Sequence, residues 1–140
     1  MSKAQILIVQ DNPSDIDLLR QALDKLQESY EAVILRDGAE ALRYVRSNYA
    51  SVREPEPCVI LLNLYLPKYD GIEVLRAVKR EPHLQHVQVV MLTSSLLPEP
   101  EGSEIRRMGA IVRKKPRQVS EIAELAQHLI DLCKKTSPVA

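Results

Sequence analysis

The chain has 140 residues and carries 19 lysines and arginines against 19 aspartates and glutamates, a formal net charge of zero. This balance argues against nonspecific nucleic-acid binding, an acidic disordered tail and a polybasic membrane anchor. Hydrophobic residues make up 45% and charged residues 27%, as in a globular protein. We therefore expect a single domain over residues 1–140, with its core spanning about 4–135.

Aliphatic side chains must fill the core, because the chain has no Trp and no Phe. Its two cysteines, Cys58 and Cys133, lie far apart and have no metal-ligand spacing. We interpret them as reduced, small hydrophobic core residues, in keeping with a cytoplasmic protein. The N-terminal segment reaches the polar Gln10 too soon for the apolar region of a signal peptide, and no apolar run approaches transmembrane length.

The first half of the chain predicts two strand–helix units. Residues 6–9 form a short aliphatic run, typical of a strand buried on both faces. Asn and Pro at 12–13 suit a helix start, and apolar residues then recur at helical spacing over 16–26. A second strand is predicted over 32–35, followed by an amphipathic helix over 39–49.

The second half continues the alternation. Further strands are predicted over 58–62, 87–92 and 110–112, and further helices over 72–78, 104–108 and 122–133. Five strands alternating with five helices indicate an α/β domain with a parallel sheet and right-handed crossovers.

Polar residues close four of the predicted strands. The first strand ends in Gln10 and Asp11, the third in Asn63 and the fourth in Thr93, while the fifth leads to Lys115. Ligands of such sheets bind beyond the carboxyl ends of the strands. We therefore expect these side chains to converge on one pocket.

Four segments carry a specific pattern: ILIVQDN at 6–12, LLNLYLPKYDG at 61–71, MLTSS at 91–95 and KP at 115–116. In this order and spacing they resemble the receiver domains of bacterial two-component response regulators. The resemblance covers nearly the whole chain and implies a flavodoxin-like, doubly wound sheet with strand order 2-1-3-4-5. The chain is similar to stand-alone receivers that partner phytochrome-type and other sensor kinases, so we expect no output domain.

The resemblance implies three acids at the site, two after the first strand and a phosphoacceptor aspartate after the third. These positions fall on Gln10, Asp11 and Asn63, so two of the three acids are amides here. The family's Mg²⁺ also takes a backbone carbonyl, which maps to Tyr65. Because this hard cation prefers carboxylate oxygens, we expect weak or absent Mg²⁺ binding through Asp11, Asn63 and Tyr65.

The chain has only some of the residues that the resemblance leads us to expect for the family's switch. The switch hydroxyl maps to Thr93 and the pocket lysine to Lys115, whereas Val112 stands where the family has an aromatic residue. Without a phosphoryl group or a ring to relocate, signalling is not expected to run by a phosphorylation-driven population shift. We also expect Lys115 to bridge Asp11 and the amide oxygen of Asn63.

These residues predict a single-domain response regulator of two-component phosphorelay signal transduction. We expect an atypical pseudo-receiver that is not an enzyme, is not phosphorylated at Asn63 and acts through protein–protein contacts. A disabled (Glu→Gln, Asp→Asn) form of a receiver that accepts phosphate from a histidine kinase stays open, because both changes are isosteric. A flavodoxin-like small-molecule binder is the other alternative, against which the missing phosphate-binding loop argues.

The expected partner is a sensor histidine kinase or another signalling protein, with no nucleic acid and no membrane. A homodimer is predicted through the face of the fourth helix, fifth strand and fifth helix. Leu96 and Leu97 make this region more apolar than a loop requires, and basic residues cluster near the fifth strand at 106–107 and 113–115.

Overall fold

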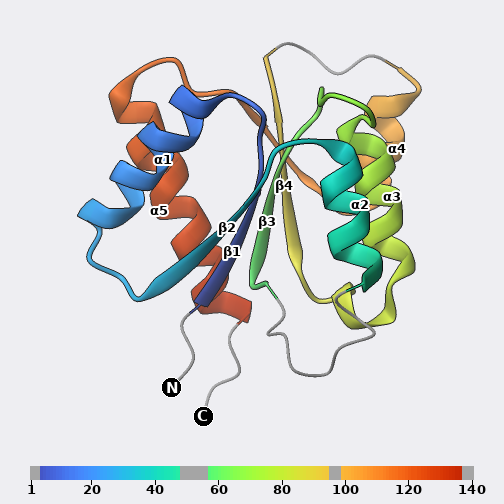
Figure 1. Ribbon diagram of the computed structural model, residues 1–140, viewed down its shortest axis with the longest axis horizontal. Helices are drawn as coiled ribbons and strands as arrows, with labels where there is room; N and C mark the ends of the chain where they lie inside the picture. Colours follow the sequence, from blue (N-terminus) through green and yellow to red (C-terminus); the bar gives the residue numbers. More distant parts are fainter. Residues whose placement is uncertain (1–3, 48–56, 95–98, 137–140) are drawn as a thin grey trace.

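Aliphatic runs form the five strands of one parallel sheet (Figure 1). The computed structural model describes residues 4–47, 57–94 and 99–136. The strands are β1 (Ala4–Val9), β2 (Tyr30–Leu35), β3 (Val59–Asn63), β4 (Gln88–Thr93) and β5 (Ile111–Lys114). Their order in the sheet is β2-β1-β3-β4-β5, which confirms the predicted flavodoxin-like topology.

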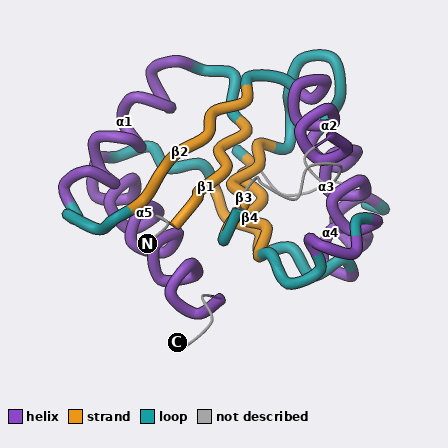
Figure 2. Tube along the Cα trace, turned by 60° about the horizontal axis from the view of Figure 1, so that its bottom comes forward, coloured by secondary structure: helices purple, strands orange, loops and turns teal. Residues whose placement is uncertain are grey.

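Helices cover both faces of the sheet. They are α1 (Pro13–Lys25), α2 (Gly38–Ser47), α3 (Gly71–Arg80), α4 (Glu101–Arg107) and α5 (Val119–Thr136), with a short 3₁₀ turn η1 (Pro82–Leu84) before β4. α1 and α5 lie on one face, and α2, α3 and α4 lie on the other (Figure 2). α4 begins three residues before the predicted position, because its first turn contains Gly102, which the apolar pattern does not detect.

Side-chain alternation along the strands divides the core into two clusters. In β1, Ile6 and Ile8 pack with residues of α1 and α5. Leu7 and Val9 point to the other face and pack with residues of α2, α3 and α4. β3 alternates in the same way, with every side chain buried, as expected for a parallel strand covered on both faces.

The pairing of β1 with β3 sets which polar residues meet. The two strands pair in parallel, with Val9 opposite Leu62. Gln10 and Asn63 are the next residues of the two chains, so they leave the sheet side by side and at the same level. Both continue the side-chain series that faces α1 and α5.

The prediction of two reduced cysteines is wrong, because Cys58 and Cys133 form a disulfide. Their Cα atoms lie 4.9 Å apart although 75 positions separate them in sequence. The end of α5 returns to the start of β3, and this proximity is created by the fold alone. Disulfides are rare in the cytosol, so the cysteines no longer support the cytoplasmic expectation.

Some expectations concern residues outside the described ranges. These are the end of the second helix at 48–49, the motif residue Ser95, and the apolar pair Leu96 and Leu97. Within the described ranges, no helix combines the length and the apolar character needed to cross a membrane.

Gly71→Ala should lower the free energy of unfolding by about 1–3 kcal/mol, as measured by urea denaturation. A Cβ atom at Gly71 would lie 2.2 Å from the carbonyl oxygen of Asn63, a backbone atom that cannot swing away. The variant should therefore also shift the backbone amide resonance of Asn63.

Gly109→Ala is the matched control, since Gly109 has a φ of +83° and open space around its Cα. It should lower the free energy of unfolding by about 1–2 kcal/mol through backbone strain alone and leave the Asn63 resonance unshifted. An unshifted Asn63 resonance in Gly71→Ala would show that this contact does not hold the end of β3.

Candidate functional site

The turn from β1 into α1 forms one side of the site. Asn12 caps the helix, its side-chain oxygen accepting a hydrogen bond from the backbone N–H of Asp15 at 3.1 Å, and Pro13 occupies the first helical position. The helix therefore starts immediately after the strand. This short connection keeps Gln10 and Asp11 at the carboxyl edge of the sheet.

A buried hydrogen bond between two amides lies at the centre of the site. Asn63 Nδ2 donates to Gln10 Oε1 at 3.0 Å, and both residues are buried. The same Gln10 oxygen accepts from the backbone N–H groups of Asp11 at 3.0 Å and Asn12 at 3.3 Å. Gln10 thus closes the turn after β1 and holds the Asn63 amide group.

The Asn63 side chain is only half satisfied. Its Nδ2 has a second, longer contact of 3.4 Å with the backbone carbonyl of Tyr65. Its Oδ1 is buried and has no hydrogen-bond partner among the described residues. The predicted bridge from Lys115 to this oxygen is therefore wrong. Gln10 presents its oxygen, an acceptor, so Asn63 turns its amide nitrogen toward Gln10 and its own oxygen is left without a donor.

The other predicted site residues differ in how deeply they are buried. Thr93 is buried at the end of β4, and its carbonyl accepts from the backbone N–H of Lys115 at 2.8 Å. Asp11 is exposed at the rim. Tyr65 contributes only its carbonyl, since its side chain is 58% exposed. Val112 is half-buried in β5 and packs against the core that faces α2, α3 and α4.

A small cavity of about 40 Å³ adjoins the pair between the sheet, α1 and α5. Gln10 and Lys115 line it together with Asp15, and apolar side chains complete the wall. Its volume has room for about two or three water molecules. Asp15 was not among the predicted site residues, because an acid in the first turn of a helix is already accounted for by the helix dipole.

The β3–α3 loop is held against the start of α2. Lys68, with a φ of +73°, places its ammonium group 3.5 Å from a carboxylate oxygen of Asp37. The backbone N–H of Glu40 donates to Asp37, and this bond, with the nearby Lys68 charge, lowers the pKa of Asp37. Gly38 donates to the carbonyl of Pro67 at 3.1 Å, so α2 and the loop lie in close contact.

These groups do not fit a Mg²⁺ site. Asp11 supplies the only carboxylate among Gln10, Asp11 and Asn63. The Gln10 oxygen already accepts three hydrogen bonds, and Asn63 turns its NH₂ group toward it. Among the described residues, no three His, Cys, Asp or Glu side chains group as metal ligands. A hard dication needs more oxygen donors than this arrangement offers.

Comparison with known proteins gives one consistent family. Residues 6–130 match the Response regulator receiver domain. Response regulator Rcp1 of Synechocystis sp. (strain ATCC 27184 / PCC 6803 / Kazusa) is 40% identical over 90 residues, which cover 64% of this chain and 61% of that protein. The chain thus spans about three fifths of this relative in the sequence alignment.

Solved structures agree over nearly the full length. The phosphorylated cyanobacterial phytochrome response regulator RcpA is similar with a TM-score of 0.81 and 31% identity, over 98% of both chains. The Mn²⁺-bound form of Rcp1 is similar with a TM-score of 0.79 and 30% identity, over 99% of both chains.

A double-mutant cycle between Gln10→Met and Asn63→Leu tests the amide pair. Gln10→Met should lower the free energy of unfolding by about 1–3 kcal/mol, because Asn63 Nδ2 loses its buried acceptor. Asn63→Leu should change the free energy of unfolding little or raise it, because it also removes the unpartnered oxygen. In the Asn63→Leu background, Gln10→Met should cost about 1 kcal/mol less. Additive costs in urea denaturation would contradict the pairing.

Mg²⁺ binding should be absent at micromolar concentrations in an isothermal titration of the purified chain. The same titration of a Gln10→Glu, Asn63→Asp variant should show tighter binding, because three carboxylates then face the site. Micromolar affinity in the unchanged chain would overturn the conclusion that its donors do not fit the metal.

Proposed function

Because the chain belongs to the response regulator receiver domain family, we propose that it is a two-component signalling receiver that does not accept a phosphoryl group. It acts instead through contacts with other proteins. One observation carries this proposal: Asn63, at the family's phosphoacceptor position, is 2% exposed and its amide nitrogen is bound to Gln10.

Phosphoryl transfer needs a nucleophile that Asn63 lacks. A carboxylate attacks phosphorus through a charged oxygen and forms an acyl phosphate. An amide oxygen carries no such charge, and its nitrogen lone pair is delocalised. With Gln10 also neutral, the site lacks the acidity that positions a metal and offsets phosphoryl charge.

The contacts around α4 support a receiver held in one state. Arg76 of α3 binds Glu104 of α4 through two hydrogen bonds of 2.6 Å. The hydrogen bond from Arg76 is the main cause that lowers the pKa of Glu104. Thr93 has no phosphoryl group to follow, and Val112 offers no ring to rotate. A ligand-driven change of state therefore lacks its trigger here.

The site is proposed to work without a bound metal. The Mn²⁺ bound to Rcp1 and the phosphorylation of RcpA are properties of those two proteins. In this chain, the hydrogen bond from Asn63 to Gln10 supports a preformed site that needs no cation to relieve repulsion between carboxylates.

Partners are proposed to be a sensor histidine kinase or another signalling protein, with the chain serving as a binding module without catalytic activity. A homodimer through α4, β5 and α5 is the second proposed contact. Val119 opens α5 with 73% exposure, and Arg106, Arg107 and Lys114 are exposed nearby in sequence. An apolar residue with basic neighbours suits a partner that carries acidic groups, so it supports the contact with another signalling protein rather than the homodimer.

A second candidate is a disabled form of a receiver that accepts phosphate from a histidine kinase. In its favour, Gln10 and Asn63 are isosteric with Glu and Asp, the residues that the resemblance leads us to expect at these positions. A small-molecule binder has less support, because the cavity beside the site has a volume of about 40 Å³.

The test uses a small acyl-phosphate donor with Mg²⁺, followed by intact-mass measurement. The unchanged chain should gain no phosphoryl group, while the Gln10→Glu, Asn63→Asp variant should gain one. Asn63→Asp alone is the matched control, because it restores the nucleophile and leaves the metal site one acid short. It should react more slowly than the double variant.

Each outcome tests the assignment of the phosphoacceptor position. A phosphoryl gain by the unchanged chain would overturn the proposal. Gain by the double variant places the phosphoacceptor position at Asn63. No gain in any variant would show that the site has lost more than two acids.

A further inference from the structure

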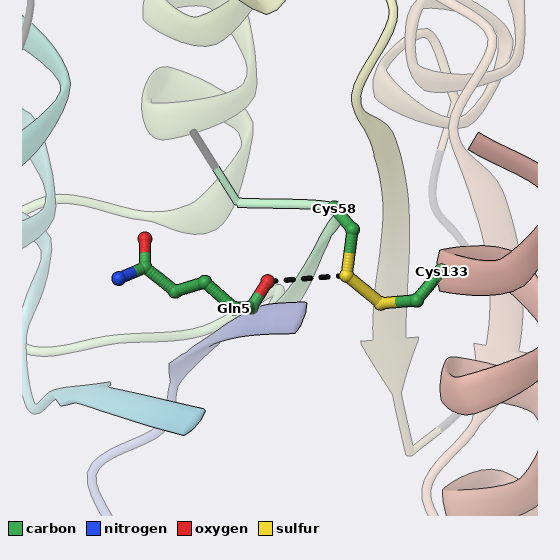
Figure 3. The surroundings of a disulfide bond; sticks show 3 residues. All are labelled: Gln5, Cys58 and Cys133. Carbon is green, nitrogen blue, oxygen red and sulfur yellow. Dashed lines mark hydrogen bonds between the residues drawn. A yellow bond between two sulfur atoms is a disulfide. The ribbon is translucent and has the colours of Figure 1, made fainter. Parts of the chain in front are cut away.

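The Cys58–Cys133 disulfide lies at the end of the sheet opposite to the candidate site. Cys58 directly precedes β3, and Cys133 lies near the end of α5 (Figure 3). The five residues of β3 separate Cys58 from the site, a distance of about 16 Å. The bridge therefore has a location and a chemistry that the receiver function does not use.

We propose that the Cys58–Cys133 pair is a reversible redox-modification site, at which a disulfide oxidant closes a covalent tether between β3 and the end of α5. The Cα–Cα distance of 4.9 Å falls within the range of ordinary disulfides, so the backbone positions suit the bond. This proposal is independent of whether Asn63 accepts a phosphoryl group.

The surroundings of Cys58 accommodate the thiol as well as the disulfide. Its backbone N–H donates to the carbonyl oxygen of Gln5 at 2.8 Å, and its Sγ lies 3.2 Å from that same oxygen. A sulfur in a disulfide carries no proton, so in the closed form this second contact is not a hydrogen bond. In the open form the thiol can donate to the carbonyl. Opening the bridge therefore leaves Cys58 with a ready acceptor.

The two sulfurs differ in their access to solvent. Cys58 is half-buried, whereas Cys133 is 3% exposed within the core shared with α1. Thiol–disulfide exchange requires a thiolate to reach a sulfur atom directly. Exchange should therefore enter at Cys58, with Cys133 as the resolving partner inside the protein.

The chemistry balances with a disulfide as oxidant. The Cys58 thiolate attacks a sulfur of the oxidant, forming a mixed disulfide and releasing one thiol of the oxidant. The Cys133 thiolate then attacks the Cys58 sulfur, closing the bridge and releasing the second thiol. The protein loses two electrons and two protons, and the oxidant is reduced to two thiols. A dithiol reverses the sequence.

The disulfide constrains the last turns of α5. Leu129, Ile130 and Leu132 bury the inner side of this helix against the sheet and α1. The bridge adds a covalent constraint where the helix ends, a place where helices otherwise fray. Oxidation should therefore protect the end of α5, which belongs to the face proposed for protein contacts.

The experiment equilibrates the purified chain in graded ratios of reduced to oxidised glutathione and measures intact mass after alkylation. The native chain should pass reversibly between a reduced form that takes up two alkyl groups and a disulfide form that takes up none. Backbone hydrogen exchange over 129–136 should be at least about tenfold faster in the reduced form, with β4 unchanged. The unfolding midpoint should fall by about 10 °C or more on reduction.

Cys58→Ala supplies the control. Its exchange over 129–136 should equal that of the reduced native chain in every buffer. If the variant does not fold, the comparison of the reduced with the oxidised form of the native chain still tests the proposal. Failure of the folded chain to form the bridge in oxidised glutathione would overturn the proposal, as would equal exchange over 129–136 in the two redox forms.

Discussion

The parallel pairing of β1 with β3 is the constraint on which the rest of the structure depends. It aligns Val9 with Leu62, so the next residues, Gln10 and Asn63, leave the sheet together. Both strands are buried on both faces, and a shift of one residue would turn apolar side chains to the wrong layer. The hydrophobic core therefore fixes the distance between the two amides, and their hydrogen bond follows from the register.

Replacing two acids by amides changes the energetics of the site. Three carboxylates at this edge would repel each other and favour a bound cation. Here one oxygen of Gln10 accepts from the Asn63 amide and from two backbone N–H groups, and Asp11 lies at the exposed rim. The unpartnered Asn63 oxygen is the remaining cost, since a buried acceptor without a donor destabilises the folded state.

Several contacts hold the elements around this site in one arrangement. Lys68 and Asp37 fasten the β3–α3 loop to the start of α2, and Arg76 fastens α3 to α4 through Glu104. Such partly exposed pairs contribute little energy individually, but the two-bond geometry of Arg76 fixes an orientation. These contacts join side chains other than Asn63, so the surface that they define does not depend on a phosphoryl group at that position.

The sequence by itself determined the alternation of strands and helices, the sheet order and the edge at which the polar residues gather. The alternation follows from local periodicity, whereas the sheet order was expected from the resemblance of segments such as 6–12 and 61–71 to receiver domains. Only the tertiary structure decided that Gln10, rather than Lys115, binds the Asn63 amide, and that Asp15 joins the cavity wall. It also decided that Cys58 meets Cys133, because contacts between residues 75 positions apart arise from packing and leave no local pattern.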